Sequence, residues 1–282
     1  MLSGLSSLLK LFKSKQQLDK PAKSKLGQSL FTLHHQTDLT SVVGNDNGWV
    51  TDIVMMNDGR LVKCVPYQCI LLICNTDGSQ VDIIDVQNGP RCITAVNNST
   101  VAVTLRWGHC IEMYDTNNKL KLKSIPVPGM LLSSGITTIN NKLVVRGYKR
   151  LQIIDHQTGE VVQKIQADCD PWRVHGSGDR IFYSDLYSNK NNNNLYWYSY
   201  TDDRHHTLKL SSHPRSMTTL QDGSMYVVCW DGSLQHVSSD GNKYKTTKTL
   251  PSISSCDEMH YNLIQRKLVI IKNNCVEVFN EI

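Results

Sequence analysis

The chain has 282 residues, of which 40% are hydrophobic and 20% are charged, an ordinary composition for a globular protein. Residues 1–27 hold six of the 30 basic residues and one of the 25 acidic residues, so the formal net charge of +5 belongs to this segment and the rest of the chain is neutral. A neutral body argues against a domain that binds DNA or RNA through bulk charge. The chain also lacks an apolar run of the roughly 18 residues that a membrane-spanning helix needs.

Residues 1–27 are predicted to be a basic leader ahead of a folded domain. Leu2, Leu5, Leu9 and Phe12 have helical spacing, and a stretch rich in Lys, Ser and Gln follows them. Lysines interrupt the apolar run, which argues against a secretory signal, and the lack of arginine argues against a mitochondrial transit peptide. We favour a flexible linker; the alternative is a helix that docks on a membrane surface or on a partner.

From residue 49 onwards, a short apolar segment followed by a tight polar turn recurs about every forty residues. The apolar segments are marked by Ile53, Ile93, Ile136, Val174, Met217 and Met259, which lie 40, 43, 38, 43 and 42 residues apart. A period of about 40–45 residues with four short strands per unit is typical of a β-propeller blade. The sequence therefore predicts an all-β, six-bladed β-propeller over residues 28–282, with blades starting near residues 50, 91, 134, 172, 215 and 257.

Each unit has two polar turns, one after its first strand and one after its third, as at 57–59 and 76–78 in the first unit. Their Asn, Asp and Gly residues supply the positive φ angles that close hairpins. The sixth unit is short, because its third strand, predicted at 275–279, ends three residues before the last residue given. Residues 29–35 alternate like a strand and have no partner of their own. We expect them to pair as the outermost strand of the last blade and to close the ring.

Nine cysteines are present, and most fall on predicted strands, where a free thiol behaves as a small buried apolar group. Without a secretory signal, the odd count favours free thiols and a cytoplasmic location. Cys64, Cys69 and Cys74 are spaced by five residues, but they form no Cys-x2-Cys pair and have no nearby histidine. We therefore expect no metal site and no cofactor.

Several segments resemble the C-terminal six-bladed propeller of tripartite-motif (TRIM) proteins, in the divergent NHL-type form found in invertebrates. They are TDIVMMNDGRL (51–61), VAVTL (101–105), SGIT (134–137), IIDHQTGEV (153–161) and VSSDGN (237–242). The resemblance covers about residues 28–282 and implies the recognition domain of a ubiquitin ligase. In the full-length members of this family, a RING finger, B-boxes and a coiled coil precede the propeller. None of these zinc modules is found in this sequence, so no ligase activity is expected from it.

The candidate binding surface is the propeller face formed by the loops between the second and third strands and by the links between blades. These segments carry Arg and aromatic residues, the residue types most common in binding hot spots. The predicted site residues are Tyr67, Arg91, Arg106, Trp107, Arg146, Tyr148, Lys149, Trp172, Arg173, Tyr187, Arg215 and Trp230. The alternative for any one of them is structural, with the ring packed between blades or the guanidinium paired with a nearby acid.

Two functions remain open. The first is a protein-interaction propeller that binds a protein or peptide on the Arg/aromatic face, as the family resemblance implies. The second is single-stranded RNA binding on the same face, as in some NHL-type propellers, by stacking of bases on Tyr or Trp beside Arg. An enzyme is not expected, because the sequence has no Gly-x-Ser-x-Gly motif and no Gly-rich phosphate loop.

Overall fold

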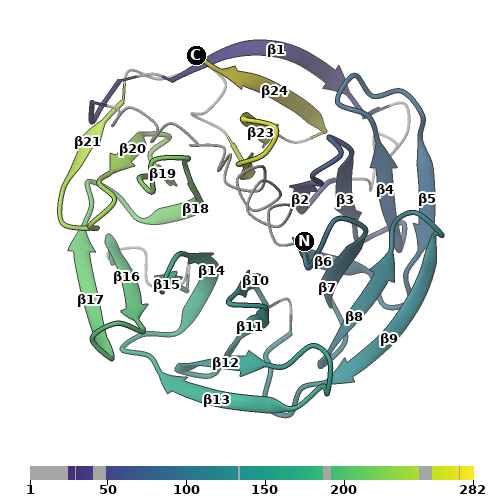
Figure 1. The fold of residues 1–282 in the computed structure, drawn as a ribbon, viewed down its shortest axis with the longest axis horizontal. Helices are drawn as coiled ribbons and strands as arrows, with labels where there is room; N and C mark the ends of the chain where they lie inside the picture. Colours follow the sequence, from purple (N-terminus) through teal and green to yellow (C-terminus); the bar gives the residue numbers. More distant parts are fainter. Residues whose placement is uncertain are drawn as a thin grey trace, which may run out of the picture.

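The computed structural model describes residues 25–28, 30–40, 49–132, 134–186, 192–247, 256–272 and 274–282. Within these ranges, 24 strands form six four-stranded antiparallel sheets that are arranged in a ring around a central channel (Figure 1). The predicted six-bladed β-propeller is therefore confirmed. None of the described residues forms a helix long and apolar enough to cross a membrane.

Five blades are each built from four consecutive strands, and the sixth combines the first strand with the last three. The strands of each blade are given from the innermost outwards. Blade one is β2 (Asp52–Met55), β3 (Leu61–Val65), β4 (Ile70–Cys74) and β5 (Asp82–Asp85), and blade two is β6 (Pro90–Ala95), β7 (Thr100–Leu105), β8 (Cys110–Asp115) and β9 (Leu120–Pro126).

Blade three is β10 (Ile136–Ile139), β11 (Lys142–Gly147), β12 (Arg150–Ile154) and β13 (Val161–Gln166), and blade four is β14 (Pro171–Ser177), β15 (Arg180–Asp185), β16 (Asn194–Ser199) and β17 (Arg204–Lys209). Blade five is β18 (Pro214–Thr219), β19 (Met225–Cys229), β20 (Leu234–Val237) and β21 (Tyr244–Thr246). Blade six is β22 (Glu258–Asn262), β23 (Lys267–Lys272), β24 (Cys275–Glu281) and β1 (Phe31–Asp38).

The N-terminal strand closes the ring as predicted. Strand β1 pairs antiparallel with β24, from Phe31 opposite Glu281 to Asp38 opposite Cys275, and it begins two residues later and ends three residues later than the predicted strand. Phe31 is buried with its ring edge-on to Tyr226 and Tyr261, at centroid distances of 5.8 and 5.7 Å. The clasp therefore joins the chain ends by hydrogen bonds and also by apolar packing between blades five and six.

The hydrophobic core is divided into six clusters, one at each junction between neighbouring blades. One cluster, for example, joins Val62 and Leu71 of blade one to Val103 of blade two. Both faces of a blade are covered by its neighbours, so the two middle strands are buried along nearly their whole length, whereas the outermost strands expose most of their residues. All nine cysteines are free thiols, and six of them are buried.

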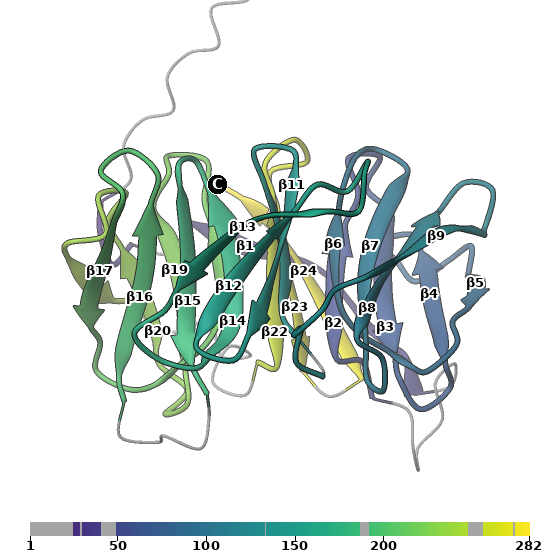
Figure 2. The ribbon, with the colours of Figure 1, turned by 90° about the horizontal axis from the view of Figure 1, so that it is seen from below.

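The two faces of the ring differ in the segments that form them. The turns after the first and third strands of each blade lie on one side, which we call the turn face. The loops between the second and third strands and the links between blades lie on the other side, which we call the loop face; it is the lower edge in Figure 2. The predicted site residues that the structure describes all belong to segments at or next to the loop face.

Candidate interaction surface

Exposed aromatic side chains gather on the loop face. Five aromatic residues are strongly exposed in the described part of the chain, and all five lie there: Trp49, Tyr67, Trp107, Tyr148 and Trp230. The exposed large aliphatic residues, in contrast, lie mainly on outermost strands, such as Ile83, or on the turn face, such as Leu263 and Ile264. Exposed aromatic residues confined to one face of a rigid scaffold are a common mark of an interaction surface.

Most of these rings are paired with a cation. The guanidinium carbon of Arg106 lies 4.4 Å from the centroid of the Tyr67 ring and 4.6 Å from that of Trp107. The guanidinium carbon of Arg215 lies 4.6 Å from the Trp230 centroid. These distances are in the range of cation–π contacts, which orient both partners before a ligand arrives.

The corner of the loop face between blades one and two is held by a tight backbone contact. The Arg106 amide donates to the Gly89 carbonyl at 2.8 Å. Gly89 has a φ of +64°, and a Cβ at this position would lie 2.6 Å from the carbonyl oxygen of Pro66, in the turn that carries Tyr67. Only glycine fits here without strain. Gly89 therefore links the segments that present Tyr67 and Arg106.

Trp49 extends this corner and was not among the predicted site residues. Its ring meets that of Tyr67 edge-on, with the centroids 5.9 Å apart and the planes at 69°. The sequence could have indicated this residue, because Trp49 lies in the segment that leads into β2 and this segment reaches the loop face. The corner thus presents Trp49, Tyr67 and Trp107 around Arg106.

Two predicted site residues are more deeply placed than their loop positions indicated. The Arg146 side chain is buried and donates to the carbonyl oxygens of Pro171 and Leu132 at 3.3 and 3.1 Å, and its guanidinium carbon lies 5.1 Å from the Trp172 centroid. It ties the links on both sides of blade three together. Arg173 points into the central channel.

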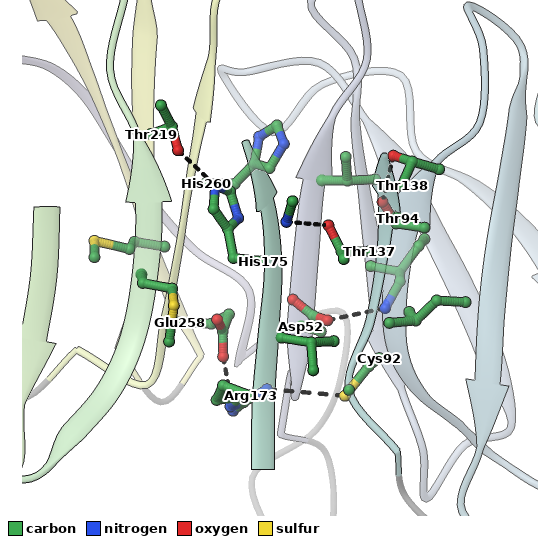
Figure 3. Close-up of a pocket in the computed structure, with 18 of the residues that line it drawn as sticks. Asp52, Cys92, Thr94, Thr137, Thr138, Arg173, His175, Thr219, Glu258 and His260 are labelled. Atoms are coloured by element: carbon green, nitrogen blue, oxygen red, sulfur yellow. Dashed lines mark hydrogen bonds and ion pairs between the residues drawn. The ribbon is translucent and has the colours of Figure 1, made fainter. Parts of the chain in front are cut away.

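Arg173 spans the mouth of the channel on the loop-face side (Figure 3). Its Nη2 atom lies 2.7 Å from Oε2 of Glu258, so the ion pair joins blades four and six, and its Nη1 atom lies 3.8 Å from Sγ of Cys92 in blade two. Burial alone would lower the pKa of Arg173, but the carboxylate of Glu258 raises it above its ordinary value. The charged Arg173 side chain therefore connects blade four to blades two and six.

A cavity of about 350 Å³ lies in the channel. Its polar side chains bridge neighbouring blades. Asp52 accepts from the amide of Ile93 at 2.9 Å, Thr137 accepts from that of Gly176 at 2.9 Å, and His175 contacts Thr219 Oγ1 at 2.9 Å, as Figure 3 shows. Similar bonds join Thr138 to Ala95, Ser216 to Met259, and His260 to Met55.

These bonds occupy all six junctions around the channel. Burial lowers the pKa of both His175 and His260 to about 4, so the two imidazoles are neutral near pH 7. Among the described residues, no three His, Cys, Asp or Glu side chains are arranged to hold a metal ion. The polar side chains of the channel thus join each pair of neighbouring blades.

The other predicted site residues lie as follows. Tyr67, Trp107, Tyr148, Lys149 and Trp230 are exposed; Arg91, Arg106, Trp172 and Arg215 are half-buried; Tyr187 lies outside the described residues. The side chains of Arg215 and Asp257 form an ion pair. The loop face therefore brings Tyr67 and Trp107 together around Arg106, whereas Tyr148 and Trp230 lie in blades three and five. Arg215 is paired, Arg146 is buried, and Arg173 is turned into the channel.

Comparisons with known proteins show the fold. No protein-family model matches the chain, and no curated protein sequence matches it. The structure is similar to that of U3-55K (TM-score 0.66, 9% identity, 84% of this chain and 97% of that one) and to the RRP9 WD40 repeats (TM-score 0.68, 8% identity, 89% and 100%). It is also similar to virginiamycin B lyase from Staphylococcus aureus (TM-score 0.63, 16% identity, 89% of each chain). At these identities the similarity establishes a β-propeller, and the TRIM/NHL resemblance stays a prediction.

Proposed function

We propose that the loop face binds a protein or peptide, and that the chain is a non-catalytic recognition module similar to the substrate-recognition propeller of tripartite-motif ubiquitin ligases. The observation that carries this proposal is the confinement of all five strongly exposed aromatic residues of the described chain to one face. Aromatic and Arg residues on a rigid scaffold supply most of the binding energy in protein interfaces.

The partial neutralisation of the loop-face cations favours a protein over a nucleic acid. Arg173 and Arg215 are neutralised by Glu258 and Asp257, and the chain beyond residue 27 has no net charge. RNA binding gains much of its affinity from phosphate contacts with unpaired cations. Single-stranded RNA is nevertheless the second candidate, because Arg106 beside Tyr67 and Trp107 is an arrangement on which bases can stack.

The test uses a phage library of random dodecapeptides panned on the immobilised protein. The affinity of the selected peptide is then measured by fluorescence anisotropy for the wild type, for a W107A/W230A double variant, and for an L263A/I264A double variant. The second variant removes similarly exposed apolar groups from the turn face. Because hot-spot truncations cost about 2 kcal/mol or more each, the loop-face variant should bind at least about thirtyfold more weakly.

The turn-face variant should bind the selected peptide like the wild type, and a loss confined to L263A/I264A would contradict the proposal. Labelled single-stranded RNA of mixed sequence is titrated in parallel at 50 and 200 mM salt. If RNA binds more tightly than any selected peptide, and its affinity falls by about tenfold or more between these salt concentrations, RNA is the ligand.

A further inference from the structure

The cations on the loop face are unevenly neutralised. In blades four to six, Arg173 and Arg215 have carboxylate partners. Arg91 and Arg106, at the junction of blades one and two, form no ion pair with any residue that the structure describes. Lys149 in blade three is a further exposed cation of this face without an ion pair among the described residues, but Arg91 and Arg106 place two unneutralised guanidinium groups at one corner.

Arg106 is the better oriented of these two cations. Its guanidinium contacts the rings of Tyr67 and Trp107, while the edge of Trp49 supports Tyr67. A guanidinium that lies over aromatic rings uses its flat faces for these contacts, so its in-plane N–H groups stay available for hydrogen bonds. Such an edge matches the two oxygens of a carboxylate.

The backbone holds this arrangement in place. The amide of Arg106 is bonded to Gly89, and the Gly89 backbone lies directly against Pro66, the residue before Tyr67. The amide of Val86 also donates to the carbonyl of Cys69 at 2.7 Å, which fastens the turn carrying Tyr67 to the link between the blades. The entropy lost when a ligand binds is smaller for a group that is already ordered.

We propose that Arg106, within the aromatic frame of Trp49, Tyr67 and Trp107, recognises the carboxylate of an Asp or Glu side chain in a peptide partner. The three rings contact the apolar residues that flank this acidic residue. The inference rests on the proposed function of the loop face, and it adds the chemical class of the ligand and the position at which its acidic residue binds.

The experiment is a positional-scanning peptide array. The central residue of each nine-residue peptide is fixed in turn as Glu, Gln, Asp, Asn, Lys or phosphoserine, and the other eight positions are equimolar mixtures. Labelled wild type, R106Q, R106K, W230A and R266Q proteins are applied. Arg266 is the matched control, because it is an exposed arginine on the turn face, 2.9 Å from Glu281.

The wild type should bind the Glu and Asp peptides about tenfold more strongly than the Gln and Asn peptides, since hydrogen bonds to charged groups are worth about that factor or more. R106Q should lose this preference, R106K should keep only part of it because lysine lacks the planar fork, and R266Q should match the wild type. An unchanged acidic preference in R106Q, a stronger signal for phosphoserine than for Glu, or tighter binding of labelled RNA would overturn the inference.

The result also separates this inference from the proposed function. If W230A weakens binding of all peptides while R106Q still prefers Glu and Asp over Gln and Asn, the loop face binds peptides but Arg106 does not recognise the carboxylate. If neither W230A nor R106Q affects binding, both the proposed function and the inference fail.

Discussion

Arg173 and Glu258 form an ion pair across the central channel, with Nη2 and Oε2 2.7 Å apart, although they lie 85 residues apart in the sequence and in blades that are not adjacent. Both side chains are largely buried, and Ser216 donates a further hydrogen bond to Glu258 at 2.7 Å. The pair braces the ring directly beneath the loop face.

Removing the carboxylate of this pair should destabilise the fold. Glu258→Ala leaves the Arg173 guanidinium buried without its partner, and such a change costs about 3–5 kcal/mol. Urea unfolding followed by tryptophan fluorescence measures the loss. The matched control is Lys119→Ala, which breaks the half-exposed pair with Asp82 and should cost less than about 1 kcal/mol. Equal losses for the two variants would show that Arg173 and Glu258 do not brace the channel.

Asp52 should make stability depend on pH. Burial raises its pKa to about 7, the charge on Glu258 adds to this, and Arg173 opposes it. Between the unfolded value of 3.8 and about pH 7, the folded protein binds one proton more than the unfolded chain, so this group's contribution to stability falls as pH rises, by about 1.4 kcal/mol per pH unit.

Comparison with Asp52→Asn isolates this contribution, because asparagine does not titrate. The difference in unfolding free energy between wild type and variant should shift by about 2 kcal/mol in favour of the variant between pH 5 and 7, then level off. A difference that stays constant with pH would mean that the pKa of Asp52 is not raised.

The clasp should depend on Phe31. Phe31→Ala removes a buried ring that packs on Tyr226 and Tyr261, and such truncations cost about 3–5 kcal/mol. Leu33→Ala is the matched control on the same strand, because Leu33 is 54% exposed. Thermal unfolding should show a clear loss for the first variant and almost none for the second. Similar melting temperatures for both would indicate that β1 contributes little to closing the ring.

Gly89→Ala should disturb the corner that presents Tyr67 and Arg106. The change combines a strained φ of +64° with a Cβ 2.6 Å from the Pro66 carbonyl oxygen. Gly178→Ala is the control, since Gly178 has a φ of +58° but nothing within 4 Å of the added Cβ. Both should lose about 1–2 kcal/mol from backbone strain. Only Gly89→Ala should lose more than this and also weaken peptide binding; equal behaviour would show that the corner tolerates displacement.

The repeat period predicted the fold because each blade buries the same pattern of strands. The clasp could be predicted because residues 29–35 had no strand partner and the sixth unit lacked its outermost strand. The roles of Arg146 and Arg173 could not be predicted in the same way. Both lie near the loop-face end of a strand, Arg146 on β11 and Arg173 on β14, and their burial depends on partners in other blades, such as Pro171 and Glu258. Lys63 is a similar case: it is fully buried on β3, with Nζ 2.8 Å from Sγ of Cys74.

The location of the binding surface is tested most directly by hydrogen–deuterium exchange of the protein with and without a peptide selected from the random library. We predict slower exchange in the loop-face segments 66–69, 86–89, 106–109, 147–149 and 230–233. Exchange in the turn-face segments 57–59, 76–78 and 221–223 should not change. Protection confined to the turn-face segments would contradict the central claim that the aromatic loop face binds the partner.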